Sequence, residues 1–208
     1  SLASKRIASL LDENSFVEVG AYITARSTDF NMTEQETPAD GVVTGYGTIG
    51  GCLVYVYSQD ASVLGGSMGE MHAKKICNIY SMAMKMGAPV IGLVDCAGLR
   101  LQEATDALDG FGKLYLSQTM ASGVIPQITA IFGTCGGGMA VSAGILTPLT
   151  AIIKRSVIPP AQISRAGNPD WQISQEMSLP LSLRSAPWFP FFRPTTRMIC
   201  HTESARMT

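Results

Sequence analysis

The sequence has few charges, few histidines and no apolar run long enough to cross a bilayer. Charged residues make up 15% of the 208 positions, and the net charge is −1. Such a balanced charge argues against a nucleic-acid partner, and a membrane-spanning helix would need about 20 consecutive apolar residues. Residues 1–7 also lack the apolar core of a signal peptide. We therefore expect a cytoplasmic globular protein.

Paired cysteines are absent as well. The five cysteines show no C-x-x-C spacing, which argues against a zinc site and against a disulfide framework. We expect no metal in this chain and free buried thiols at these positions, which are Cys52, Cys77, Cys96, Cys135 and Cys200.

Motifs for nucleotide binding and for hydrolysis by a catalytic triad are missing too. No segment reads G-x-x-x-x-G-K-[ST] or G-x-S-x-G, and the glycines of 65–69 do not form G-x-G-x-x-G. Only two histidines exist, and we expect His72 to be a capping or solvated residue on a helix face rather than a general base. For Arg100 and Glu103 we expect a structural pair near the start of a helix.

Strand and helix patterns alternate along the chain. Gly50 and Gly51 predict a two-residue hairpin turn, because glycine supplies the positive φ that such a turn requires. Alternating strands and helices favour an α/β layered fold with helices covering a largely parallel sheet. We expect helices at 4–11, 70–86 and 104–121, strands at 16–23, 41–49, 52–57, 90–94 and 128–132, and a loop at 28–40.

Three segments rich in small residues follow the predicted strands, at 58–69, 95–103 and 133–138. A single turn of this kind usually serves a structural purpose. Three of them at strand ends favour one binding pocket, because ligands collect outside the carboxyl ends of parallel strands. Backbone N–H groups in such turns can stabilise the enolate of a thioester, and this reaction needs no side-chain nucleophile.

These segments resemble the motifs of one family. Asp95 to Glu103 is similar to D-S-G-G-A-R-I-Q-E, Leu64 to Glu70 to G-G-S-x-G-E, and Gly133 to Gly138 to G-x-C-A-G-G. Between about residues 7 and 144 the chain thus resembles the carboxyltransferase subunits of biotin-dependent acyl-CoA carboxylases and decarboxylases. These belong to the crotonase-like superfamily, and the glutaconyl-CoA and methylmalonyl-CoA decarboxylase types look most similar.

The resemblance implies a crotonase-like fold and an acyl-CoA substrate. It also implies carboxybiotin on a partner carrier protein, with biotin carboxylase or membrane decarboxylase subunits as further partners and a homo-oligomer as the assembly. In the family a second, homologous domain binds carboxybiotin, and we expect no such domain in this chain. The implied oxyanion-hole residues are Ala97 and Gly98, and those shaping the CoA pocket are Gly65, Gly66, Gly136, Gly137 and Gly138. Ala97 stands where many members have glycine, which requires a negative φ here.

The composition changes after Gly144. Residues 1–144 hold 20 of the 21 glycines and 3 of the 11 prolines, whereas 145–208 hold one glycine and eight prolines. In a shifted reading frame, the codons for 188–208 permit V-S-V-L-P-P-N-N-E-D-D-M-S-Y-G-E-C-T-D-D, which resembles the linker between the family's two domains. We therefore expect a partial N-terminal carboxyltransferase domain at 1–144 and a frame-shifted tail at 145–208, with impaired activity.

Two other functions fit the residues. A stand-alone crotonase-type enoyl-CoA hydratase or isomerase would need acidic side chains at the pocket. A non-catalytic fragment could bind only CoA or a partner subunit.

Overall fold

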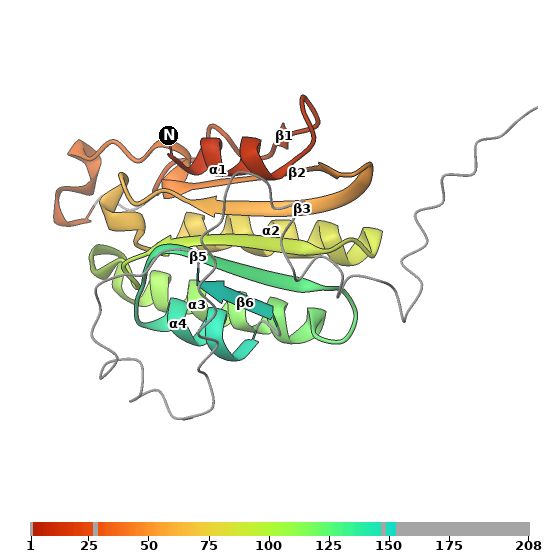
Figure 1. Cartoon of the computed structure of the whole chain (residues 1–208). Helices are drawn as coiled ribbons and strands as arrows, with labels where there is room; N and C mark the ends of the chain where they lie inside the picture. Colours follow the sequence, from red (N-terminus) through yellow and green to blue (C-terminus); the bar gives the residue numbers. More distant parts are fainter. Residues whose placement is uncertain (1, 27–28, 147–148, 153–208) are drawn as a thin grey trace, which may run out of the picture. The chain divides into compact units, whose positions relative to one another are not determined.

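A six-stranded sheet in the order β1-β2-β3-β4-β5-β6 forms the centre of the described chain. The computed structural model describes residues 2–26, 29–146 and 149–152, and Figure 1 shows the strands running across the molecule. The strands are β1 Val17–Glu18, β2 Val42–Ile49, β3 Cys52–Gln59, β4 Val90–Cys96, β5 Gln127–Cys135 and β6 Leu149–Ile152. The α-helices are α1 Leu2–Leu10, α2 Glu70–Met86, α3 Ala104–Ala121 and α4 Gly138–Val141.

The sheet is mixed rather than uniformly parallel. Strands β3 to β6 pair in parallel, whereas β1 and β2 add an antiparallel edge. The β2–β3 hairpin turns at Gly50 and Gly51, whose φ values of 59° and 80° confirm the predicted glycine turn. The buried runs in the sequence predicted the parallel part, and the glycine turn predicted the antiparallel pairing of β2 with β3.

The predicted strand at 16–23 is mostly wrong, because only Val17–Glu18 pairs with β2. Gly20 adopts φ +76°, and the Ile23 N–H donates to its carbonyl at 3.2 Å, so the chain turns away from the sheet. The predicted loop at 28–40 contains two short 3-10 segments, η1 Asp29–Glu34 and η2 Pro38–Gly41.

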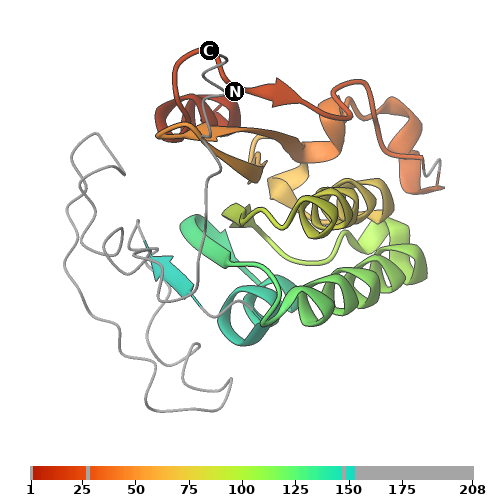
Figure 2. The ribbon, with the colours of Figure 1, turned by 90° about the vertical axis from the view of Figure 1, so that its right-hand side faces the viewer.

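The two long helices begin and end where the sequence predicts. Gly87 ends α2 in the left-handed conformation, and its N–H donates to the Ala83 carbonyl. Figure 2 shows α2 and α3 side by side on one face of the sheet, with α1 beside β2 and β3 on the other face. The parallel strands from β3 to β5 are therefore connected by helices on a single face.

The main core lies between α2, α3 and the sheet. Its fully buried members come from both helices and from alternate positions of the strands, as the two-residue period of a strand requires. They include Tyr57, Ile76, Ile79, Val94 and Leu114. No helix in the described part of the chain is long and apolar enough to cross a membrane.

Candidate functional site

The three glycine-rich segments meet at the carboxyl ends of β3, β4 and β5. The Ala97 N–H donates to the Gly65 carbonyl at 3.1 Å, which ties the first segment to the second. The Gly136 N–H donates to the Cys96 carbonyl at 2.9 Å, which ties the third segment to the second. Their predicted proximity is therefore confirmed, and it follows from the parallel pairing of the strands that precede them.

Glycine is required at several points where these segments touch. Gly98 has φ +119°, a conformation that side chains rarely adopt, and a Cβ there would lie 3.4 Å from the Gly136 carbonyl oxygen. A Cβ on Gly66 would overlap the Asp95 carbonyl oxygen. Ala97 is not among the described residues with positive φ, so alanine is tolerated at this position.

The backbone donors of the 95–100 turn are not equally available. The Ala97 N–H is already used by Gly65, and the Gly98 N–H lies 3.4 Å from the Cys96 sulfur. Leu99 lies opposite Met68 in a parallel β-bridge. The backbone hydrogen bonds of this bridge join Met68 to Gly98 and Arg100, the residues on either side of Leu99. Its own N–H therefore faces away from Met68 and has no hydrogen-bond partner within the described part of the chain.

The 133–138 turn also offers backbone donors. Neither Gly137 nor Gly138 has a hydrogen-bond partner for its N–H among the described residues. Gly137 is exposed, and its nitrogen lies 3.8 Å from the position that a Cβ on Gly98 would take. The sequence did not indicate Leu99, because only the bridge to Met68 shows which N–H of the turn at 95–100 has no hydrogen-bond partner in the described part of the chain.

Asp95 connects the two turns through its side chain. One carboxylate oxygen accepts the Thr134 N–H at 3.1 Å, and the other pairs with the Arg6 guanidinium at 2.7 Å. Arg6 lies on α1, donates also to the Gln59 carbonyl, and stacks 4.9 Å from the centre of the Phe132 ring. The first residue of the D-C-A-G motif is thus engaged in holding β4 to β5 and α1.

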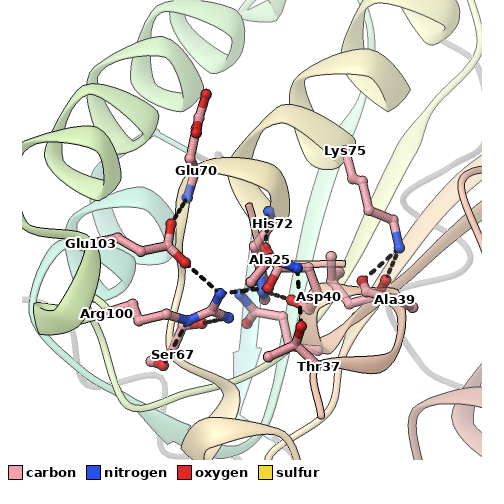
Figure 3. Close-up of polar contacts among 12 residues, drawn as sticks. Ala25, Thr37, Ala39, Asp40, Ser67, Glu70, His72, Lys75, Arg100 and Glu103 are labelled. Carbon is pink, nitrogen blue, oxygen red and sulfur yellow. Dashed lines mark hydrogen bonds and ion pairs between the residues drawn. The ribbon is translucent and has the colours of Figure 1, made fainter. Parts of the chain in front are cut away.

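Arg100 forms the centre of a buried ionic cluster (Figure 3). Its guanidinium donates to Asp40 at 2.5 Å, to Glu103 at 2.8 Å and to the Ser67 carbonyl at 2.8 Å. The second Glu103 oxygen accepts the Glu70 N–H at 2.6 Å at the start of α2. The expected pairing of Arg100 with Glu103 is confirmed, and Asp40 is an additional partner that the sequence did not indicate.

His72 lies in the core rather than at the surface, so the expectation of a solvated residue is wrong. Its Nδ1 is 2.8 Å from the Asp40 carbonyl oxygen, and its Nε2 is 3.1 Å from the Gln59 side-chain nitrogen. Because the carbonyl can only accept and the Gln59 NH₂ can only donate, the proton belongs on Nδ1. Desolvation by burial, followed by the nearby Arg100 charge, lowers the pKa of His72 to about 3.

The described cysteines near the turns are not activated nucleophiles. Burial raises the pKa of the Cys96 thiol to about 11 and that of Cys135 to about 12. A thiol with such a pKa carries almost no thiolate at neutral pH. Cys77, Cys96 and Cys135 have free thiols as expected, whereas Cys52 does not, and Cys200 lies outside the described residues.

Residues 1–155 match the Carboxyl transferase domain family. The chain belongs to this family. The predicted resemblance is therefore confirmed, and the glycine-rich turns described above are those of a carboxyl transferase domain. The match extends beyond Gly144, up to which the resemblance was recognised in the sequence.

Curated relatives include subunits of decarboxylases and carboxylases. The chain is 51% identical over 154 residues to the methylmalonyl-CoA decarboxylase subunit alpha of Veillonella parvula, a match that covers 74% of this chain and 30% of the relative. It is 53% identical over 154 residues to the propionyl-CoA carboxylase beta chain of Roseobacter denitrificans, with the same coverage. The chain thus spans about 30% of the length of these relatives.

Solved structures with the same fold come from related complexes. Transcarboxylase 12S, a hexamer solved with hydrolysed methylmalonyl-coenzyme A, is 40% identical with a TM-score of 0.73, covering 80% of this chain and 34% of that one. A Pseudomonas malonate decarboxylase hetero-tetramer is 25% identical with a TM-score of 0.68, covering 79% of this chain and 64% of that one. The expected crotonase-like α/β fold is confirmed, and the domain is partial.

Proposed function

We propose that the described residues form the acyl-CoA half of a carboxyltransferase site, and that the parent protein transfers a carboxyl group between biotin and an acyl-CoA. The observation that carries this proposal is the pair of N–H groups at Leu99 and Gly137 that lack partners in the described chain, on two turns in direct contact. Two such donors can bind one thioester oxygen and stabilise the negative charge that develops on it.

Each of the glycine-rich residues has a role in this proposal. Ala97 and Gly98 shape the turn so that the next amide, that of Leu99, faces the substrate. The glycines of the other two segments form the walls of the CoA pocket, because they let the backbone pack closely. These are the residues predicted from the sequence, Gly65, Gly66, Gly136, Gly137 and Gly138.

The described side chains support chemistry at the backbone over acid–base chemistry. An enoyl-CoA hydratase or isomerase would need an available carboxyl group near the turns. Asp95 is bound to Arg6 and Thr134, while Glu103 is bound to Arg100 and the Glu70 amide. His72 is buried with its nitrogens engaged, and its low pKa makes it a poor base. Carboxyl transfer, in which carboxybiotin supplies the carboxyl group, needs none of them.

Carboxyl transfer also requires a second half of the site, which binds the carboxyl donor. We propose that a second carboxyltransferase domain supplies this carboxybiotin half. A biotin carrier protein would deliver the group in a homo-oligomer with biotin carboxylase or membrane decarboxylase subunits. Relatives that are subunits of larger assemblies support this view.

We further propose that the C-terminal part of the chain is translated out of frame. The change in composition after Gly144 supports this, as does the family-like peptide that permitted codons would give in the shifted frame. The family match to residue 155 favours a frame change near that position, so that 145–155 would still belong to the domain. Sequencing the gene from codon 140 to codon 165 tests this, and an unbroken frame with independent support for residues 156–208 would contradict it.

Activity can be tested on the parent protein with its frame restored. We expect biotin-dependent exchange of labelled carboxyl groups between propionyl-CoA and methylmalonyl-CoA, and no hydration of an enoyl-CoA. Hydration without biotin would instead support the hydratase. For the 208-residue chain as it stands, we expect acyl-CoA binding without turnover.

A further inference from the structure

Gln59 is the last residue of β3, and its side chain contacts both the turn at 95–100 and the helix that follows the turn at 133–138. It is fully buried, and its side-chain oxygen accepts the Asp95 N–H at 3.2 Å, at the start of the first turn. Its side-chain nitrogen lies 3.7 Å from the sulfur of Met139 in α4, immediately after the second turn. The Gln59 amide group therefore contacts the start of the turn that carries Leu99 and the helix that follows Gly137.

The contact with the Asp95 N–H favours one of the two orientations of this amide. A glutamine side chain can exchange the places of its oxygen and nitrogen by rotating 180° about its last bond. In the exchanged orientation an NH₂ group would face the Asp95 N–H, and two donors would meet without an acceptor. Such a loss costs more than the bond itself contributes, because the Gln59 side chain is fully buried and its NH₂ group cannot turn to water.

His72 favours the same orientation from the other side of the amide. Its Nε2, 3.1 Å from the Gln59 nitrogen, must accept a hydrogen bond, because the ring proton is held on Nδ1 by the Asp40 carbonyl at 2.8 Å. Asp40 is held in turn by Arg100, two residues after Gly98, and its carboxylate also accepts the His72 backbone N–H at 2.6 Å. A series of polar contacts therefore runs from the Arg100 guanidinium through Asp40, His72 and Gln59 to the Asp95 N–H, and each donor in it meets an acceptor. Figure 3 shows Arg100, Asp40 and His72 at one end of this series.

We infer that Gln59 and His72 are positioning residues that hold the Leu99 and Gly137 amides at the spacing required for one thioester oxygen. This inference rests on the proposed function and adds to it the residues that set the donor geometry. Neither side chain touches substrate in this arrangement. Their effect is confined to the carbonyl oxygen of the ligand and leaves the rest of the CoA molecule unaffected.

A pair of ligands isolates this effect. Propionyl-CoA carries the thioester oxygen, and its S-propyl thioether analogue lacks that oxygen but keeps all of CoA. We expect the complete 208-residue chain to bind propionyl-CoA more tightly than the thioether in isothermal titration. Equal affinity for both ligands in the unmodified chain would overturn the proposed function itself.

Two variants of one position then test the inference. His72→Gln keeps an acceptor near the place of Nε2, whereas His72→Asn keeps a donor near the place of Nδ1 and loses the acceptor. We expect His72→Asn to lose the preference for propionyl-CoA by about fivefold, as expected for the loss of one or two hydrogen bonds, and His72→Gln to retain most of it. Gln118→Leu is the matched control, since Gln118 is equally buried but bonds to Tyr80.

The result that overturns the inference is an unchanged preference in a folded His72→Asn chain, or an equal loss in all three variants. A measurement on the unmodified chain keeps the test independent of variant folding. The ¹⁵N shifts of the His72 ring must show a neutral ring with the proton on Nδ1. A proton on Nε2 would overturn the inference without any variant.

Discussion

The Arg100 guanidinium donates to the Asp40 carboxylate across 2.5 Å, and solvent reaches neither side chain. These residues are 60 positions apart, so their contact joins the η2 turn to the turn that carries the proposed donors. Burial raises the pKa of Asp40, and the Arg100 charge lowers it in opposition. The carboxylate is therefore stable in this position only while Arg100 remains beside it.

Replacement of Arg100 tests this dependence. Arg100→Met should destabilise the chain by about 3–5 kcal/mol, because Asp40 and Glu103 would be left as buried carboxylates without a counter-charge. Urea unfolding followed by circular dichroism measures the effect. Lys113→Met is the control, since Lys113 pairs with Asp109 at the surface, and we expect little change there. An equal decrease in the free energy of unfolding in the two variants would show that the buried ion pairs of Arg100 stabilise the chain no more than a surface pair does.

Acid should destabilise the chain through His72. Its pKa is about 3 in the folded chain, against 6.5 for an unperturbed histidine, so the unfolded chain binds more protons between these values. By linkage, stability is complete above pH 6.5 and falls as the pH decreases toward 3, by about 2 kcal/mol between pH 7 and pH 5 from this residue. Urea unfolding at several pH values measures the slope, and His72→Gln should remove this part of it. An identical pH profile in the variant would refute the prediction.

Two glycines should respond to alanine in opposite directions. Gly112 lies inside α3, and a Cβ there meets nothing within 4 Å, so Gly112→Ala should stabilise the chain by up to about 1 kcal/mol. Gly98 has φ +119° and faces the Gly136 carbonyl, so Gly98→Ala should cost about 1–3 kcal/mol. Thermal unfolding of the two variants gives the comparison. A stable Gly98→Ala chain would mean that this turn can relax.

Asp95 should protect the second turn from solvent exchange. Its carboxylate accepts the N–H of Thr134, an exposed residue, at 3.1 Å. Asp95→Ala should therefore accelerate hydrogen exchange at Thr134, whereas Asp95→Asn keeps an acceptor oxygen and should slow that exchange nearly as well as the native residue. Nuclear magnetic resonance exchange rates distinguish the two, and fast exchange in the unmodified chain would contradict the bond.

The local signals in the sequence predicted the helices and the hairpin well. Gly87 and the apolar spacing before it define the limits of α2, and Gly50 with Gly51 defines the hairpin, because each depends only on neighbouring residues. The predicted strand at 16–23 was mostly wrong, since only Val17–Glu18 is a strand: Gly20 turns the chain, which the run of apolar residues does not reveal.

The site was predicted in outline for a similar reason. Glycine-rich segments after strands indicate where backbone donors gather, and parallel pairing brings them together. Which amide remains available at 95–100 depends on hydrogen bonds to residues about 30 positions away, namely Gly65 and Met68. No local pattern encodes that choice.

The sequence by itself determined the family, the segments of the turns and the break in composition near Gly144, because motif spacing and residue type carry this information directly. Only the tertiary structure decided that Ala97 is engaged, that Leu99 is available, and that His72 is a buried neutral residue joined to Gln59 and Asp40. The physical reason is that a hydrogen bond depends on distance and direction in space. Residues remote in the chain therefore determine which backbone groups are left for a ligand.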